Sequence, residues 1–211
     1  MHFIGRSEVS VVISWAIRMA KRTPLGGVVH WWRRARDRRL PTQAAKYATI
    51  REYAAAYEVH TFVETGTYEG DAVFACLGSF DRIYSIELAT ELFQRASDRF
   101  AGDSHVEILQ GDSTYVLPAI LEKISEPCLF WLDGHYSCGT TAQGEQDTPI
   151  RAELRAILDH RVKGHVVLID DARLFAGRNG YPTLSDVKEV VLCTNPLACY
   201  SVKDDIVRLL L

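Results

Sequence analysis

The chain has 211 residues, of which 47% are hydrophobic and 24% are charged, and its formal net charge is −3. This composition excludes a disordered or collagen-like chain and is typical of a globular protein whose single domain buries a full core. Five cysteines without a CxxC pair indicate reduced, mostly buried thiols, which favours a cytoplasmic location.

The charge is distributed unevenly along the chain. Residues 1–40 carry nine Lys and Arg against two Asp and Glu, whereas residues 41–211 carry fifteen against twenty-five. We therefore expect a basic, amphipathic helical extension over 1–40 and a separate acidic domain over 41–211.

Apolar residues at helical spacing over 7–22 predict an amphipathic helix, which is too short for a bilayer that needs about 20 apolar residues. Two tryptophans and five arginines follow over 30–39. Two interpretations stay open for the extension: peripheral contact with the inner face of a membrane, or packing on the domain or on a second copy as a homo-oligomer. We expect no nucleic acid partner, because the acidic domain would repel phosphate.

After the extension, Pro41 and Thr42 mark a helix start, and the helix is expected over 43–59. Apolar, β-branched runs then predict strands at 60–64, 82–87, 106–109, 128–133 and 165–170. Helices are expected between and after them, at 71–77, 89–100, 113–124, 149–161 and 185–194. The end of the chain, 199–211, reads as a hairpin that turns at Asp204 and Asp205. The alternation predicts an α/β fold: a doubly wound, Rossmann-like, seven-stranded and mostly parallel sheet with an antiparallel C-terminal strand.

Each of the five predicted parallel strands ends in, or runs into, an acidic residue. Ligands of doubly wound sheets bind at the carboxyl ends of the strands, so these acids predict a binding site there. The acids are Glu64, Glu87, Asp112, Asp133, Asp170 and Asp171.

The first strand leads into the turn "VETGTYEG", in which Gly66 and Gly70 allow a tight turn and close approach of a ligand. Glu87 follows Gly66 by 21 residues, about where an acid that binds ribose hydroxyls is expected. The turn lacks the G-x-G-x-x-G of dinucleotide sites, and Glu64 and Glu69 would repel a pyrophosphate. A ligand with ribose hydroxyls, an amino group and a sulfonium suits these charges better.

With these motifs the sequence resembles the class I S-adenosylmethionine-dependent methyltransferases over residues 45–211. "VETGTYEG", "SIEL" and "QGDS" are similar to the family's first motif, ribose-binding acid and adenine-contacting segment. The resemblance implies S-adenosylmethionine (SAM) as cofactor. It implies as the binding residues Glu64, Gly66, Thr67, Gly70, Glu87, Asp112, Ser113 and Asp133.

Within that family, an acid after the fourth strand and an Asp-Asp pair after the fifth are similar to the metal-dependent small-molecule O-methyltransferases of the macrocin and catechol type. This resemblance implies a magnesium ion on Asp133, Asp170 and Asp171, where it would hold and acidify an acceptor hydroxyl. The alternative is that the acids form ion pairs without a metal, with Arg151, Arg155 or Arg173 as partners.

Two residues are candidates for the catalytic base. His135 lies in the loop after the fourth strand and has a suitable ordinary pKa of about 6.5, while Asp133 could act directly or through water. The catechol enzymes have a lysine three positions after the acid, and here that position is Tyr136. A loop histidine satisfied by a backbone carbonyl is the alternative for His135.

The acceptor is expected to meet two polar loops, 134–149 and 172–186. The second offers Phe175 and Tyr181 for stacking on a ring, and Arg173 and Arg178 for an anionic group. We therefore predict an O-methyltransferase for a small-molecule or sugar hydroxyl, such as a lipid- or nucleotide-linked glycan. The alternative is a non-catalytic nucleotide-binding or scaffold protein that docks through its basic extension.

Overall fold

The computed structural model describes residues 40–134 and 148–211, so the predictions for 1–39 and for His135 lie outside the described residues. The described helices are α3 (Gln43–Tyr57), α4 (Asp71–Cys76), η1 (Leu77–Ser79), α5 (Thr90–Arg99), α6 (Ser113–Lys123), α7 (Ile150–Asp159), η2 (Ala172–Leu174) and α8 (Leu184–Thr194). The strands are β1 (Thr61–Thr65), β2 (Arg82–Glu87), β3 (Val106–Gln110), β4 (Cys128–Leu132), β5 (Val166–Ile169), β6 (Cys199–Lys203) and β7 (Ile206–Leu210). Within these two ranges, no helix has the length and apolar character needed to cross a membrane.

The seven strands form one sheet in the order β3-β2-β1-β4-β5-β7-β6. β7 runs antiparallel to both of its neighbours, and the other adjacent strands are parallel. The turn between β6 and β7 consists of Asp204 and Asp205, both with positive φ, which suits the right-handed twist of a tight hairpin. The predicted fold class is therefore confirmed, and the strand order reverses between β1 and β4, where ligands of such sheets bind.

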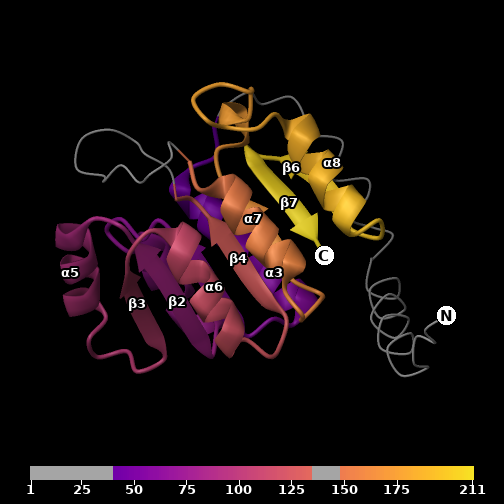
Figure 1. The fold of residues 1–211 in the computed structure, drawn as a ribbon. Coiled ribbons are helices and arrows are strands. Elements are labelled where there is room, and N and C mark those ends of the chain that lie inside the picture. Colours follow the sequence, from indigo (N-terminus) through magenta and orange to yellow (C-terminus); the bar gives the residue numbers. More distant parts are fainter. Residues whose placement is uncertain (1–39, 135–147) are drawn as a thin grey trace, which may run out of the picture. The chain divides into compact units, whose positions relative to one another are not determined.

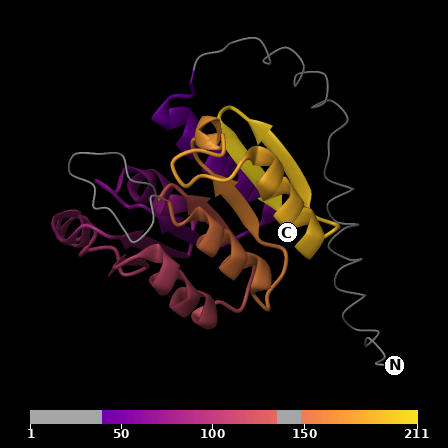
Figure 2. The same cartoon turned by 45° about the horizontal axis from the view of Figure 1, so that its top comes forward.

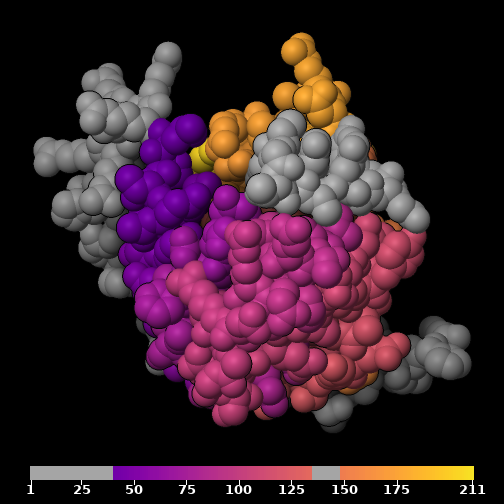
Figure 3. Space-filling view, turned by 90° about the vertical axis from the view of Figure 1, so that its left-hand side faces the viewer, coloured from indigo at the N-terminus to yellow at the C-terminus, as the bar shows by residue number. Residues whose placement is uncertain are grey.

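Helices cover both faces of the sheet, with α6 and α7 in front of it and α3 behind it in the views of Figures 1 and 2. Successive strand residues point to opposite faces, so Val63 and Phe130 join the core under α6, α7 and α8. Phe62 and Leu129 join the core under α3 and α4. α5 packs against β2 and β3, at the edge of the sheet that faces the viewer in Figure 3.

Helix α3 brings its first turns to the carboxyl edge of the sheet, because it ends at the amino edge where β1 begins. Thr42 caps the helix by accepting a hydrogen bond from the Ala45 N–H, and Glu58 ends it in a left-handed conformation. Ile50 and Ala54 lie on its buried face. Lys46 precedes Ile50 by four residues, so it lies on the same face, one turn nearer the carboxyl edge.

Two histidines form a hydrogen-bonded pair at the amino edge of the sheet. His165 is 1% exposed, its Nδ1 accepts from the Cys128 backbone N–H at 3.0 Å, and its Nε2 lies 2.9 Å from Nδ1 of His160. The pKa of His165 is lowered to about 4, mainly by burial and also by the neighbouring charges of His160 and Lys163. His165 is therefore neutral in the folded protein at neutral pH.

The buried histidine pair predicts that the folded protein loses stability at acidic pH. In the unfolded chain His165 is protonated with a pKa of about 6.5. Between about pH 6.5 and 4 the unfolded state therefore binds more protons than the folded state, and the free energy of unfolding decreases as the pH is lowered. The largest slope for one proton is about 1.4 kcal/mol per pH unit. Replacing His165 with Asn keeps an acceptor for the Cys128 N–H and removes the titration. We therefore expect urea denaturation to show that the free energy of unfolding of the wild type exceeds that of His165→Asn by less and less as the pH is lowered from about 6.5 to about 4. A constant difference from pH 7 to 4 would contradict the assignment.

Candidate functional site

The predicted acidic residues meet at the carboxyl edge, because backbone hydrogen bonds join neighbouring strand ends in sequence. The Gly111 N–H donates to the Glu87 carbonyl at 2.9 Å, and the Asp133 N–H donates to the Thr65 carbonyl at 3.1 Å. The Asp170 N–H continues the series by donating to the Leu132 carbonyl at 3.1 Å. The ends of all five parallel strands therefore face one region.

The glycines of the first turn are required by its geometry. Gly66 has φ of 86°, and a Cβ placed on it would lie 2.7 Å from the carbonyl oxygen of Asp133. Gly70 begins α4 with φ of 78°, and its Cβ would lie 2.7 Å from the Phe100 ring. A side chain at either position would strain the backbone and meet atoms already in place. The turn therefore brings bare backbone to the point between β1 and β4 where a ligand is expected.

Glu87 is held in a fixed orientation at the end of β2. Its Oε2 accepts from the Tyr68 N–H at 2.8 Å, its Oε1 accepts from the Ala89 N–H at 2.9 Å, and the residue is buried. Each carboxylate oxygen has a second lone pair, so Glu87 retains acceptor capacity for two hydroxyls.

Glu64 is a buried acid next to the first turn. Its Oε2 accepts from Ser85 Oγ at 2.5 Å, and Ser85 Oγ lies 2.6 Å from the Thr67 hydroxyl. Burial raises the pKa of Glu64 well above its usual range; the Ser85 hydrogen bond opposes this, and the charges of Asp133 and Glu87 add to it. A cation bound beside Glu64 would favour its ionised form. Thr67 was predicted to bind the cofactor; its hydroxyl is hydrogen-bonded to Ser85, and cofactor binding by this residue stays a prediction.

Asp112 and Ser113 follow β3 and lie beside a buried acid of α7 that was not predicted from the sequence. Asp112 caps α6 by accepting from the Thr114 N–H at 2.8 Å, and Ser113 begins that helix. Glu153 of α7 is 1% exposed, and its pKa is raised to about 7, mainly by burial and against the opposing effect of the Ser113 and Thr65 hydroxyls. Glu153 therefore interacts with Ser113 and Asp112 of the predicted adenine-contacting segment.

The acid pair after β5 carries its own cations. Lys46 Nζ lies 2.5 Å from Asp170 Oδ2 and 3.3 Å from Asp171 Oδ1. Arg173 Nη1 lies 2.6 Å from Asp171 Oδ1 and also pairs with Asp205. The structure therefore supports Arg173 as a partner of the pair, which was the metal-free alternative, and adds Lys46, which the sequence reasoning missed.

These residues do not fit the predicted magnesium ion. Mg²⁺ needs carboxylate oxygens directed at one shared point that the ion can occupy. Oxygens of both Asp170 and Asp171 do share such a point, but the Lys46 ammonium occupies it. Among residues 40–134 and 148–211, no group of three or more His, Cys, Asp or Glu is arranged to hold a metal. The structure therefore does not support a metal site on Asp133, Asp170 and Asp171.

The acceptor residues predicted in the loop after β5 need correction. Phe175 is buried in the core, where its ring meets that of Tyr181 edge-on at 5.3 Å, so it does not offer a free face to a substrate. Arg173 and Arg178 are both exposed, and Nη1 of Arg173 is already paired with two carboxylates. The prediction that Phe175 stacks on a ring is therefore wrong, and the binding of an anionic substrate by Arg173 or Arg178 stays a prediction.

Two tyrosines lie near the acids. Burial raises the pKa of Tyr47 to about 12, and the charges of Asp71, Glu64, Asp133 and Asp170 add to the rise. Burial also raises the pKa of Tyr181 to about 12, with contributions from Asp171 and Asp133. Tyr47 was not predicted from the sequence, and it follows Lys46 on α3.

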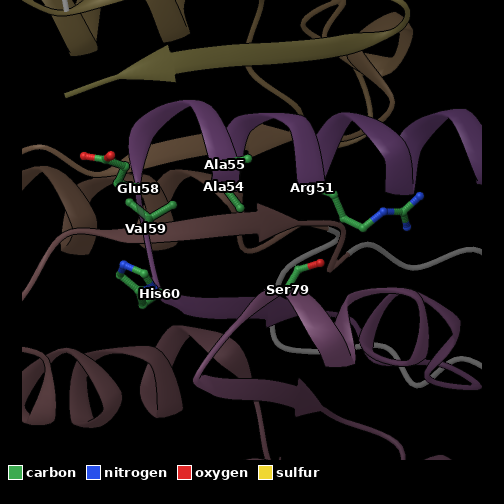
Figure 4. A pocket seen from close by; sticks show the side chains of 7 residues that line it. All are labelled: Arg51, Ala54, Ala55, Glu58, Val59, His60 and Ser79. Carbon is green, nitrogen blue, oxygen red and sulfur yellow. The ribbon is translucent and has the colours of Figure 1, made fainter.

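A cavity of about 580 Å³ lies at the opposite edge of the sheet. It opens between the C-terminal half of α3 and η1, and Arg51, His60 and Ser79 are among its lining residues (Figure 4). These residues lie near the amino ends of β1 and β2, so the cavity shares no residue with the acids described above.

Comparison with solved structures identifies the fold. TomG from Streptomyces achromogenes, an O-methyltransferase of tomaymycin synthesis solved with SAM, has a TM-score of 0.58 at 18% identity, covering 82% of this chain and 81% of TomG. An O-methyltransferase from Bacillus cereus in complex with S-adenosylhomocysteine has a TM-score of 0.59 at 13% identity, covering 99% and 92%. The 23S rRNA methyltransferase ErmE has a TM-score of 0.52 at 18% identity, covering 81% and 68%.

No protein-family model matches the sequence, and no curated protein is detectably similar to it. At identities this low the structural likeness shows the fold alone. The chain therefore has the fold of the class I SAM-dependent methyltransferases.

Proposed function

We propose that this protein is a SAM-dependent O-methyltransferase acting on the hydroxyl of a small molecule or sugar. One observation carries the proposal: two buried carboxylates, Glu64 and Glu87, lie on either side of a tight turn whose conformation requires glycine at position 66. Glu64 and Gly66 lie at the end of β1, which borders the reversal of strand order, and Glu87 ends the neighbouring strand β2.

The residues present fit SAM by their chemistry. Glu87, already oriented by two backbone N–H groups, would accept from the ribose hydroxyls. Glu64, buried and short of positive charge, suits the ammonium of the methionine part. Neither carboxylate suits a pyrophosphate, so a dinucleotide is disfavoured. When bound, SAM supplies a methyl group on a sulfonium, which an acceptor oxygen can attack.

Asp133 is the proposed base. It follows β4 next to Gly66, is only partly buried, and its charge reaches Glu64, Asp170 and Tyr181. It can accept the acceptor's hydroxyl proton as the new C–O bond forms, and the S–CH₃ electron pair stays on sulfur. His135 remains a predicted alternative outside the described residues.

A small-molecule acceptor is supported by O-methyltransferases among the similar structures, although the rRNA methyltransferase ErmE shares the same fold. The acidic balance of residues 41–211 argues against nucleic acid. We further propose that the protein is cytoplasmic. Its basic extension would contact either the inner face of the membrane or a second copy of the chain. A non-catalytic scaffold is disfavoured, because acids stand at the ends of all five parallel strands.

The proposal is tested by transfer of label. The full chain is incubated with SAM carrying a tritiated methyl group and with panels of sugars, glycosides, phenols, amines and RNA, and label in each acceptor is counted. We expect transfer to at least one hydroxyl compound and none to its deoxy analogue. Absence of transfer to hydroxyls, together with transfer to an amine or a nucleic acid, would overturn the O-methyltransferase assignment.

Replacing Glu87 with Ala should weaken S-adenosylhomocysteine binding at least about tenfold, because hydrogen bonds to a charged acceptor are worth about 1.5–3 kcal/mol. Isothermal calorimetry measures the affinity. Glu91→Ala is the matched control, since Glu91 is exposed on α5 and four residues away. Equal affinities for both variants and the wild type would mean that Glu87 does not hold the ribose.

A further inference from the structure

The environment of Lys46 is unusual for a lysine. Lys46 is 7% exposed and lies on the buried face of α3, one turn before Ile50. Its Nζ is within 3.3 Å of both Asp170 and Asp171, which are 124 and 125 residues further along the chain. Burying an ammonium is costly unless it is paired, so the chain keeps this lysine inside only because the acid pair is there.

The acid pair needs the positive charge just as much. The pKa of Asp170 is raised to about 6: burial is the main cause, the charge of Asp133 acts in the same direction, and the hydrogen bond from Lys46 opposes the rise. Burial by itself lowers the pKa of Lys46, but the hydrogen bonds and charges of Asp170 and Asp171 leave it above its ordinary value. Each partner therefore stabilises the charge of the other.

Two cationic side chains supply positive charge to the acid pair. Asp170 and Asp171 bring two negative charges, and Lys46 and Arg173 bring two positive ones, with Arg173 shared with Asp205. A divalent ion bound to the same two carboxylates would supply the same double positive charge. Both cannot be accommodated, because the ion would have to displace an ammonium that is 2.5 Å from Asp170 Oδ2.

We infer that the Lys46 ammonium occupies the position that a divalent metal ion would take between Asp170 and Asp171. By forming ion pairs with both carboxylates, Lys46 prevents a metal ion from binding to them. The inference deepens the function proposed above and rests on it in one respect, that this edge of the sheet receives the acceptor. Lys46 is then a positioning residue. It fixes the first turns of α3, and with them Tyr47, against the site.

The test uses Mn²⁺ as the probe, because it accepts the same oxygen ligands as Mg²⁺ and its free form is counted directly by electron paramagnetic resonance. The proteins are the full chain, Lys46→Ala, Lys46→Arg, Asp170→Asn and the double variant Lys46→Ala with Asp170→Asn. Lys123→Ala is the matched control, since Lys123 is exposed and pairs with Glu107, which is not one of the acids of the site. Circular dichroism verifies folding.

We expect no site-specific Mn²⁺ binding by the wild type, Lys46→Arg or Lys123→Ala. Lys46→Ala should gain one site, at least about tenfold tighter than any binding by the wild type, and the double variant should lose it. A role of Lys46 in packing alone would not create a metal site.

Two outcomes would overturn the inference. One is Mn²⁺ binding by the wild type at one site that Asp170→Asn removes, which would restore the metal assignment and does not depend on any Lys46 variant folding. The other is a folded Lys46→Ala variant that gains no site. S-adenosylhomocysteine affinity is measured on the same samples, so a failure of cofactor binding counts against the proposed function and not against this inference.

Discussion

Replacing Gly66 with Ala is expected to reduce S-adenosylhomocysteine affinity by at least about 100-fold, which corresponds to about 2.7 kcal/mol. The φ of 86° at this position already costs a residue with a Cβ about 1–2 kcal/mol. The added Cβ would also lie 2.7 Å from the Asp133 carbonyl oxygen, a backbone atom that cannot rotate away. Relief of this contact must move the turn or the end of β4, and both border the proposed cofactor site.

The chain offers a matched control in Gly78. It lies in η1, its φ is not positive, and a Cβ there would meet nothing within 4 Å. Gly78→Ala should therefore leave affinity unchanged and thermal stability nearly so. If Gly66→Ala bound S-adenosylhomocysteine as tightly as Gly78→Ala does, the ligand would not approach the first turn and the proposed site would be misplaced.

The second large effect is expected from Asp133→Asn. Removing a general base typically costs about 10²–10⁴ in rate, and Asn keeps the size of the side chain. The rate constant of methyl transfer, measured once an acceptor is found, should fall at least about 100-fold, while S-adenosylhomocysteine affinity changes far less.

Asp81→Asn serves as its control, because Asp81 is exposed at the amino edge of the sheet. A rate for Asp133→Asn within about threefold of the control would exclude Asp133 as the base. The predicted alternative, His135, would then be the residue to replace.

The sheet could be predicted from the sequence because its signals are local. β-branched apolar runs gave the strands to within one or two residues, and Asp204 and Asp205 marked the hairpin turn because Asp tolerates positive φ. The position of the acids at one edge followed from the parallel order of the strands. These conclusions need only short-range pattern and topology.

The partners of those acids could not be predicted in the same way. Asp170 and Asp171 looked like metal ligands because their counter-charge, Lys46, is more than 120 residues away on a helix whose rotation the sequence does not specify. A signal did exist. Lys46 stands four residues before Ile50 and eight before Ala54, on the buried stripe of α3, where an unpaired lysine is unfavourable.

Glu153 was not predicted either, because its partners are also distant in the sequence. Its position on a buried helical stripe could have indicated it. It lies in the stripe of Ile150, Leu154 and Ile157 on α7, at a position where a carboxylate must find partners inside the protein. Phe175 shows the opposite error. An aromatic residue in a polar loop was predicted to contact the substrate, but the loop folds back and buries its ring against Tyr181.

The central claim is that the carboxyl edge of this sheet binds SAM, and calorimetric titration with S-adenosylhomocysteine tests it most directly. The full chain is titrated with this ligand in EDTA and in magnesium, with NAD as a parallel ligand. We predict one site per chain, the same affinity in EDTA and in magnesium, and no binding of NAD. Folded protein that binds no S-adenosylhomocysteine, or that binds NAD in its place, would contradict the assignment of Glu64, Gly66 and Glu87 to this cofactor.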